Sequence, residues 1–327
     1  MIISRTPLRI SFAGGGSDIP SFYKKNSYGC VLSSAINKYI YVSVKSHSKL
    51  FMEKIRLNYS ETETINNIEK IKNPIIKACL NFLGINENIY ISTVADAPGS
   101  SGLGSSSSFC VGLLNALYAF KGESINRNRL AREAAKIEME VLQRPIGKQD
   151  HYAAAFGGVN SFKFHSDDSI TIRPIDETSK YTKLMFRNLL TFFTNHSRDA
   201  AKILNNQNKR AALNNDNLLL IRQQAEYLYD QIHKEKLTIK QFGEILDEGW
   251  KIKKNLSKKV SNRTIDDIYD IAKKKGAYGG KLSGAGGGGF LSFVVKKDLR
   301  GDLIKTLSKK KLQYFPLESD TSGSILL

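Results

Sequence analysis

A loop rich in glycine and serine, residues 98–108, is the segment whose composition most directly suggests chemistry. It reads PGSSGLGSSSS and lies between a segment of strand character and one with helical spacing. Free backbone N–H groups and the helix dipole at such a junction favour an anion, and phosphate is the natural one. The alternative is a flexible loop without chemical importance. It is disfavoured because the expected strand and helix lie immediately before and after the loop.

The way in which this loop would neutralise phosphate differs from that of a standard P-loop. Ser105-Ser106 stand where a Walker loop needs Lys followed by Ser or Thr, so a P-loop NTPase is disfavoured. Backbone amides, serine hydroxyls and a magnesium ion would together have to meet the phosphate charge. One serine oxygen would then be a ligand of the hard cation.

A second glycine cluster, residues 279–289, reads GGKLSGAGGGG and contains a formal GxGxxG at Gly284, Gly286 and Gly289. A dinucleotide-binding fingerprint follows a strand and opens a helix, whereas here a helix is expected before the cluster and a strand after it. We therefore expect glycines that let the backbone approach another loop or a ligand phosphate closely. A simple hinge is an equal alternative for this cluster taken alone.

Carboxylates gather between residues 138 and 150. On the helix expected to end near Leu142, Glu138 falls on the apolar stripe and Glu140 on the polar one. An inward carboxylate needs a partner because an unpaired buried charge is costly, and both a magnesium ion and a core arginine would serve. Asp150 follows in a glycine-led turn, where a carboxylate is more often a helix cap than a base.

Strands and helices must bring these segments together. Alternating apolar residues predict strands, and apolar residues at helical spacing predict helices. We expect strands at 8–12, 30–36, 38–45, 88–94 and 290–295, and helices at 74–83, 105–120, 128–142, 198–235, 239–256 and 264–275.

Length, composition and charge limit the class of protein. With 327 residues, 41% hydrophobic and 24% charged, the chain is expected to pack as two domains, residues 1–175 and 176–327. No apolar run approaches the roughly 20 residues that a bilayer core requires, so no membrane association is expected. Three widely spaced cysteines favour a cytoplasmic protein without disulfides. The net charge of +18 would attract nucleotides, phosphorylated metabolites and polyanions alike.

Residues 7–18 complete a recognisable pattern. They read PLRISFAGGGSD and place a strand arginine and a loop aspartate on either side of three glycines. In the order PLRISFAGGGSD, PGSSGLGSSSS and KLSGAGGGG, the three segments resemble the three motifs of the GHMP kinases. The resemblance implies an α/β fold with a ribosomal protein S5-like N-terminal domain, a ferredoxin-like C-terminal domain and a site between them. It also implies ATP and Mg²⁺ as cofactors.

The first motif, together with GKQDHYAAAFGG, is similar to the GHMP branch that phosphorylates D-glycero-D-manno-heptose 7-phosphate on its anomeric hydroxyl. This resemblance implies a 1,7-bisphosphate product for nucleotide-activated heptose and surface polysaccharide synthesis. A fucokinase-like or other anomeric sugar kinase is the first alternative, and a mevalonate-type alcohol is a third acceptor. The partners expected are therefore ATP and a small-molecule sugar phosphate.

The resemblance also implies roles for single residues. Asp150 would accept or orient the proton of the acceptor hydroxyl, and Arg9 would stabilise developing charge. Ser106 and Glu138 would bind magnesium, with Glu140 as an alternative because the spacing to Asp150 is one residue longer than in mevalonate kinase. The ATP phosphates would bind Pro98, Gly99, Ser100, Ser101, Gly102, Leu103, Gly104, Ser105, Ser106 and Ser107. The acceptor would contact Gly15, Gly16, Ser17, Asp18, Lys148, Arg198, Gly284, Gly286 and Gly287.

A basic nucleic-acid-binding protein is the alternative from a different class, since an S5-like fold also occurs in ribosomal proteins. It predicts salt-dependent binding to DNA or RNA without ATP turnover. No homeodomain, zinc-finger or RNP-like pattern accompanies the charge, so no nucleic acid partner is expected. A catalytically inactive sugar sensor is disfavoured because Asp150, Arg9 and the phosphate loop occur together. Neither the oligomeric state nor the adenine-binding residues follow from the sequence.

Overall fold

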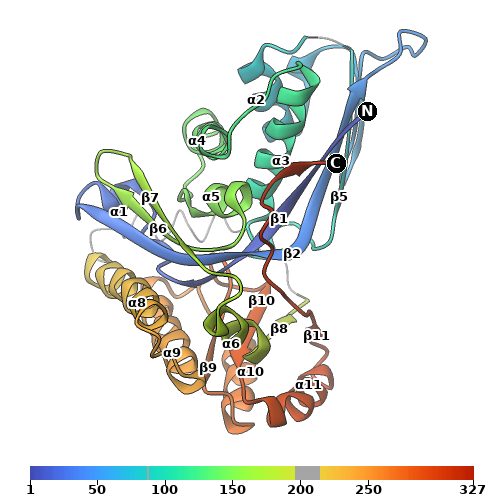
Figure 1. The fold of residues 1–327 in the computed structure, drawn as a ribbon. Coiled ribbons are helices and arrows are strands. Elements are labelled where there is room, and N and C mark those ends of the chain that lie inside the picture. Colours follow the sequence, from blue (N-terminus) through green and yellow to red (C-terminus); the bar gives the residue numbers. More distant parts are fainter. Residues whose placement is uncertain (87, 196–213) are drawn as a thin grey trace.

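The computed structural model describes residues 1–86, 88–195 and 214–327. In these ranges the chain forms two β-sheets, and helices lie on both sides of the larger one (Figure 1). The larger sheet has eight strands in the order β12-β1-β2-β5-β3-β4, with β6 and β7 attached through β2. Its strands are β1 (Ile2–Ala13), β2 (Tyr28–Ser46), β3 (Ile55–Asn58), β4 (Thr62–Ile65), β5 (Ile89–Ala95), β6 (Val159–His165), β7 (Ile170–Ile175) and β12 (Ile325–Leu326).

Strand β2 organises this sheet. Its first half pairs with β6 and its second half with β5, while β1 runs antiparallel along most of its length. The two strands predicted at 30–36 and 38–45 are therefore wrong as separate elements. Pro7 faces Tyr39 and Leu8 faces Ile36, so two residues of β2 bulge at the point where the apolar alternation is interrupted.

The helices of the N-terminal half cover one side of the larger sheet, and two long helices cover the other side (Figure 1). Most of the N-terminal set packs around α3, which contacts β1, β2, α2, α4 and α5, whereas the short first helix packs against β2. It consists of α1 (Pro20–Tyr23), α2 (Pro74–Leu83), α3 (Ser105–Phe120), α4 (Arg127–Lys136), the π-helical turn η2 (Ile137–Val141) and α5 (Gln149–Phe156). The opposite side carries α8 (Asn215–His233) and α9 (Ile239–Leu256).

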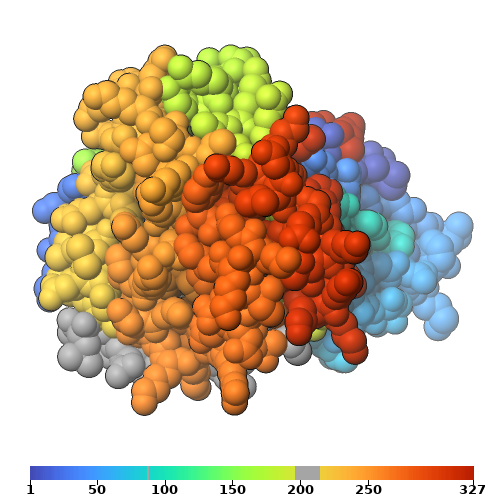
Figure 2. Space-filling view, turned by 90° about the horizontal axis from the view of Figure 1, so that it is seen from below, coloured from blue at the N-terminus to red at the C-terminus, as the bar shows by residue number. Residues whose placement is uncertain are grey.

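The smaller sheet is antiparallel, with the order β11-β8-β10-β9. Its core contains Phe192, Phe293 and Trp250, each at most 1% exposed. Figure 2 shows this end of the molecule, where the C-terminal part of the chain, drawn in yellow to red, forms most of the surface. The elements are β8 (Leu189–Phe193), β9 (Gly279–Leu282), β10 (Phe290–Val294) and β11 (Gln313–Tyr314), with α6 (Lys180–Asn188), α10 (Arg263–Lys274) and α11 (Arg300–Ser308).

Local capping explains why several helices begin and end where the sequence predicts. Asn73 accepts hydrogen bonds from two amides at the start of α2, and Gly84 ends that helix in the left-handed conformation. Thr238 and Gln241 form a capping box at the start of α9. The bounds predicted for α2, α3 and α9 are confirmed, as is the α/β class.

Two helix predictions need qualification. The helix expected at 128–142 is α4 followed by the π-helical turn η2, in which the Leu142 amide donates to the Ile137 carbonyl. The helix expected from residue 198 lies outside the described residues until α8 begins. The domain boundary at residue 175 stays a prediction. In the described part of the chain, no helix is both long and apolar enough to cross a membrane.

Candidate active site

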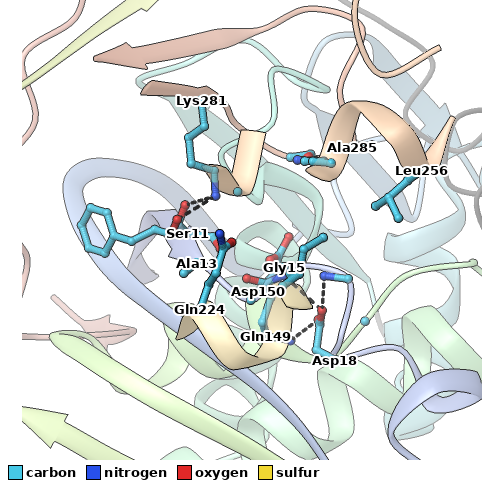
Figure 3. Close-up of a pocket in the computed structure, with 18 of the residues that line it drawn as sticks. Ser11, Ala13, Gly15, Asp18, Gln149, Asp150, Gln224, Leu256, Lys281 and Ala285 are labelled. Carbon is cyan, nitrogen blue, oxygen red and sulfur yellow. Dashed lines mark hydrogen bonds between the residues drawn. The ribbon is translucent and has the colours of Figure 1, made fainter. Parts of the chain in front are cut away.

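A pocket opens where the end of β1, the start of α5 and helices α8 and α9 meet the strand β9 (Figure 3). The glycine turn after β1 forms its floor, and apolar side chains from α8 and α9, among them Ile221 and Trp250, form one wall. Its charged lining, within the described ranges, consists of Arg9, Lys253, Lys281, Asp18 and Asp150. The pocket therefore joins residues from both ends of the chain.

Arg9 and Asp150 form a two-pronged ion pair beside the glycine- and serine-rich loop at 98–108, which we call the phosphate loop after its expected role. Arg9 Nε lies 2.6 Å from Asp150 Oδ1, and Nη2 lies 2.5 Å from Oδ2. The same guanidinium donates through Nη1 to the Gly102 carbonyl at 2.7 Å. Gly104, with φ of +77°, lies so close that an added Cβ would sit 3.1 Å from Arg9 and 3.3 Å from Asp150. The loop at 98–104, Arg9 and Asp150 are thus one packed unit.

Asp18 is enclosed at the base of the pocket. It is 2% exposed and accepts hydrogen bonds from the amides of Gly16 at 3.0 Å and Gln149 at 3.1 Å, and from the Gln149 side chain at 3.3 Å. An added Cβ at Gly147 would lie 1.9 Å from the Asp18 carboxylate, so glycine is required there. Burial raises the pKa of Asp18, and the negative charge of Asp150 adds to the increase while the amide hydrogen bonds oppose it.

The neighbours of Asp18 in the first motif have different positions. Gly15 and Gly16 line the pocket, as expected for acceptor-binding residues. The Ser17 hydroxyl is fully buried and contacts the carbonyls of Gly14 and Cys30 at 2.8 and 2.9 Å. Ser17 therefore holds the turn against β2 in this structure and does not line the pocket.

The second glycine cluster contacts the phosphate loop directly. The Phe290 amide donates to the Ser101 carbonyl at 3.2 Å. At Gly289, with φ of +101°, an added Cβ would lie 2.0 Å from the same oxygen. Close approach to another loop, one of the interpretations left open by the sequence, therefore applies to Gly289. Gly284 lines the pocket, whereas Gly286 and Gly287 pack against the backbone of Val260.

Glu138 is the centre of a second polar cluster on the other side of α5. Its side chain is 0% exposed, whereas Glu140 is exposed, so the inward direction predicted for Glu138 is confirmed. Its carboxylate is surrounded by donors: Ser106 Oγ at 2.5 Å, Ser107 Oγ at 2.8 Å, His151 Nε2 at 2.8 Å and Arg144 Nη1 at 2.5 Å. Burial opposes ionisation, but His151, Ser106 and Arg144 outweigh it and lower the pKa of Glu138 to about 2.

This cluster fits a divalent cation in part. The Ser106 hydroxyl and Glu138 Oε1 converge at 2.5 Å, and oxygens of this kind are the ligands that Mg²⁺ prefers. A protein cation, Arg144, already contacts both oxygens. In the described ranges no group of three or more His, Cys, Asp or Glu residues is arranged for a metal, so nucleotide oxygens and water would have to supply the other ligands.

Of the two weaker predictions for acceptor contacts, Lys148 is not in the pocket lining. Lys148 pairs with Asp168 at 2.7 Å and lines a separate depression with Tyr23 and Lys24. Arg198 lies outside the described residues.

Two other lysines line the pocket instead, and sequence reasoning did not identify them. Lys281 donates to the carbonyls of Ser11 at 2.7 Å and Phe12 at 3.1 Å, and Lys253 donates to the Gly284 carbonyl. Burial lowers the pKa of Lys281 to about 7, and the charge of Arg9 contributes. Lys281 could have been found from the sequence, because it lies within the second glycine cluster. Lys253 lies in no glycine-rich motif that would have pointed to it.

Comparisons with known proteins show the family to which the chain belongs, the GHMP kinases. The family model "GHMP kinases N terminal domain" matches residues 68–158, and "GHMP kinases C terminal" matches residues 231–311. A D-glycero-alpha-D-manno-heptose 7-phosphate kinase of Campylobacter jejuni is 32% identical over 329 residues, covering 95% of this chain and 94% of that protein. A galactokinase of Pyrococcus furiosus is 26% identical and covers 91% of this chain and 90% of its own length.

A solved structure shows the same fold. The crystal structure of a D-glycero-D-manno-heptose 1-phosphate kinase from Bacteroides thetaiotaomicron superposes with a TM-score of 0.80 at 24% identity. The match covers 100% of this chain and 99% of that one, so both sheets and their helices have counterparts there.

Proposed function

We propose that this chain, which belongs to the GHMP kinase family, transfers the γ-phosphoryl group of ATP to the anomeric hydroxyl of D-glycero-D-manno-heptose 7-phosphate. Family membership makes the protein a kinase with ATP as its phosphoryl donor. The proposed product is the 1,7-bisphosphate, a precursor for nucleotide-activated heptose. The observation that carries the proposal is that Arg9, which lines the pocket, contacts both Asp150 and the Gly102 carbonyl of the phosphate loop.

The chain's own residues account for the chemistry. Phosphates bound by residues 98–107 would lie beside Arg9, which can stabilise charge that develops on the transferred group. Asp150, held by both prongs of Arg9, would orient the acceptor hydroxyl or accept its proton. Phosphoryl transfer through a loose transition state depends mainly on such positioning. Magnesium held by Ser106 and Glu138 would neutralise phosphate charge.

The shape and charge of the pocket support a phosphorylated sugar. Asp18 and the backbone of Gly15 and Gly16 offer polar contacts to sugar hydroxyls, and Trp250 gives the opposite wall an apolar surface. Among the described residues of the lining, Arg9, Lys253 and Lys281 face two carboxylates, and Lys281, whose pKa is lowered to about 7, gains its full charge next to an anion. This balance favours an acceptor that carries a negative charge. The Campylobacter relative is named for a substrate of this kind.

A neutral sugar is the second candidate acceptor, because fucokinase and galactokinase relatives cover about nine tenths of this chain at 25–26% identity. The two candidate acceptors differ in whether their binding depends on the lysines of the pocket. Replacement of Lys281 and Lys253 should weaken binding of a sugar phosphate far more than binding of a neutral sugar. The nucleic-acid alternative predicts a protein without ATP turnover, which kinase family membership disfavours.

The deciding experiment is ADP release by the purified protein with ATP, Mg²⁺ and one acceptor at a time. The panel contains D-glycero-D-manno-heptose 7-phosphate, fucose, galactose, mannose and mevalonate. Release that depends on the heptose phosphate, with a new anomeric phosphorus signal in the NMR spectrum of the product, would support the proposal. Turnover of a neutral sugar alone would mean that this sugar, and not the heptose phosphate, is the acceptor. No ADP release with any of the five acceptors, together with tight and salt-sensitive RNA binding, would contradict kinase function.

A further inference from the structure

The guanidinium of Arg144 lies between the two oxygens that are candidates for metal binding. Its Nη1 is 2.5 Å from Ser106 Oγ and 2.5 Å from Glu138 Oε1. Arg144 follows the π-helical turn η2, and its side chain is 30% exposed although the carboxylate that it contacts is fully buried. A surface side chain thus supplies a positive charge to an interior anion.

The two oxygens of Glu138 have different surroundings. Oε2 accepts hydrogen bonds from Ser107 and from His151, both of which are buried and belong to the packed helices α3 and α5. Oε1 faces Ser106 and Arg144, which lie toward the phosphate loop. The core therefore fixes one edge of the carboxylate, and the other edge is presented to a cation.

We propose that Arg144 is an exchangeable internal counter-ion: its guanidinium neutralises Glu138 in the nucleotide-free enzyme and leaves when a divalent cation binds Ser106 and Glu138. The inference deepens the proposed function and rests on it for the metal site. A guanidinium nitrogen and a metal ion that bridge the same two oxygens from the same side would overlap, and their like charges repel each other. The exchange keeps the buried carboxylate paired at every stage, which matters because an uncompensated buried charge is costly.

The position of Arg144 gives the released guanidinium a second partner. Ser106 lies in the first turn of α3, directly after the loop that would hold the phosphates. A guanidinium that leaves Glu138 therefore remains within side-chain reach of nucleotide phosphate oxygens, which it can bind with two N–H groups. The exchange would move Arg144 from the carboxylate to the nucleotide without moving α3 or α5.

Direct metal binding tests the exchange without any turnover. Mn²⁺ alone serves as the probe, and electron paramagnetic resonance measures its free concentration over wild-type protein and the variants R144Q, R144K and E138Q. We expect R144Q to bind Mn²⁺ about tenfold more tightly than wild type, because one competing positive charge is gone. R144K keeps a cation and should stay within about threefold of wild type. E138Q should abolish this binding.

Unchanged or weaker Mn²⁺ binding by a folded R144Q variant would overturn the proposal, as would equal tightening in R144K. A second measurement covers the case in which R144Q does not fold. In wild-type protein labelled with ¹⁵N arginine, the Nε–H signal that disappears in R144K belongs to Arg144. Addition of Mg²⁺ with a non-hydrolysable ATP analogue should shift that signal, and an unchanged signal would also overturn the exchange. Neither measurement involves the acceptor. Failure of the exchange can therefore be distinguished from failure of the proposed heptose kinase activity.

Discussion

Two buried carboxylates on either side of α5 show how surroundings decide the behaviour of one chemical group. Glu138 and Asp18 are 0% and 2% exposed, and both accept several hydrogen bonds. The donors to Glu138 include His151 and Arg144, and its pKa falls to about 2. The donors to Asp18 are neutral amides, its neighbour Asp150 is negative, and its pKa rises. Burial alone therefore predicts neither role; the charge of the partners does.

The start of α5 connects the two regions. Asp150 points to Arg9 in the pocket lining, and the next residue, His151, points to Glu138. Successive residues on one helix turn thus hold the Arg9 ion pair and the Glu138 cluster in fixed relation. Because the two residues contact different partners, substitutions on each side can test the two regions separately.

The largest expected effect is on turnover. Asp150→Ala should lower kcat by about a thousandfold, because the acceptor hydroxyl loses the group that orients it or accepts its proton. ATP binding, measured by calorimetry, should stay within a few-fold of wild type since the phosphate loop is intact. Asp150→Asn is the matched variant that keeps the shape and removes the charge. Unaltered turnover in both variants would remove Asp150 from the mechanism.

The next effect is on stability at the Glu138 cluster. Glu138→Gln removes the carboxylate that pairs with Arg144 and accepts from Ser106, Ser107 and His151, and should lower the free energy of unfolding by about 1–3 kcal/mol. Glu140→Gln, on an exposed side chain of the same turn, should change it by less than about 0.5 kcal/mol. Urea denaturation measures both. Equal losses would mean that burial and pairing do not distinguish the two glutamates.

A smaller and more selective effect is expected around Asp18. Gly147→Ala would place a methyl group 1.9 Å from the carboxylate, so the cage of amides must move. We expect the KM for the acceptor to rise about tenfold, as overpacking of this kind costs about 1–3 kcal/mol. The KM for ATP should change little. Gly301→Ala, where no atom lies within 4 Å of the added Cβ, is the matched control. An equal rise in both KM values would contradict a local effect on Asp18.

The smallest effect is the opposite pH dependence of the two carboxylates. Glu138 has a lowered pKa, so its stabilisation is present above pH 4.5 and is lost as the pH falls toward about 2. Asp18 has a raised pKa, so the folded state binds its proton more readily and gains stability as the pH falls toward 3.8. The stability of wild type relative to Glu138→Gln and to Asp18→Asn should therefore change with opposite sign. The same slope for both pairs would refute the comparison.

The bounds of several helices and the direction of Glu138 could be predicted because they depend on residues close together in the sequence. Asparagine and glycine caps mark the ends of α2, and the apolar spacing of α3 marks its length. Helical periodicity placed Glu138 inward even though its turn is π-helical, since that turn continues directly from α4. The bulge that keeps β2 continuous was missed because a bulged pair of residues interrupts the alternation without ending the strand.

The sequence by itself determined the ordered motifs, the position of the glycine- and serine-rich loop at a strand-to-helix junction and the direction of Glu138. Each of these follows from glycine chemistry, capping or periodicity over a few residues. Only the tertiary structure decided that Arg9 meets Asp150 across 141 residues, that His151 and Arg144 share Glu138, and that Lys281 lies in the pocket that Lys148 does not line. Such contacts depend on how the two sheets and their helices pack, and no local pattern records that packing.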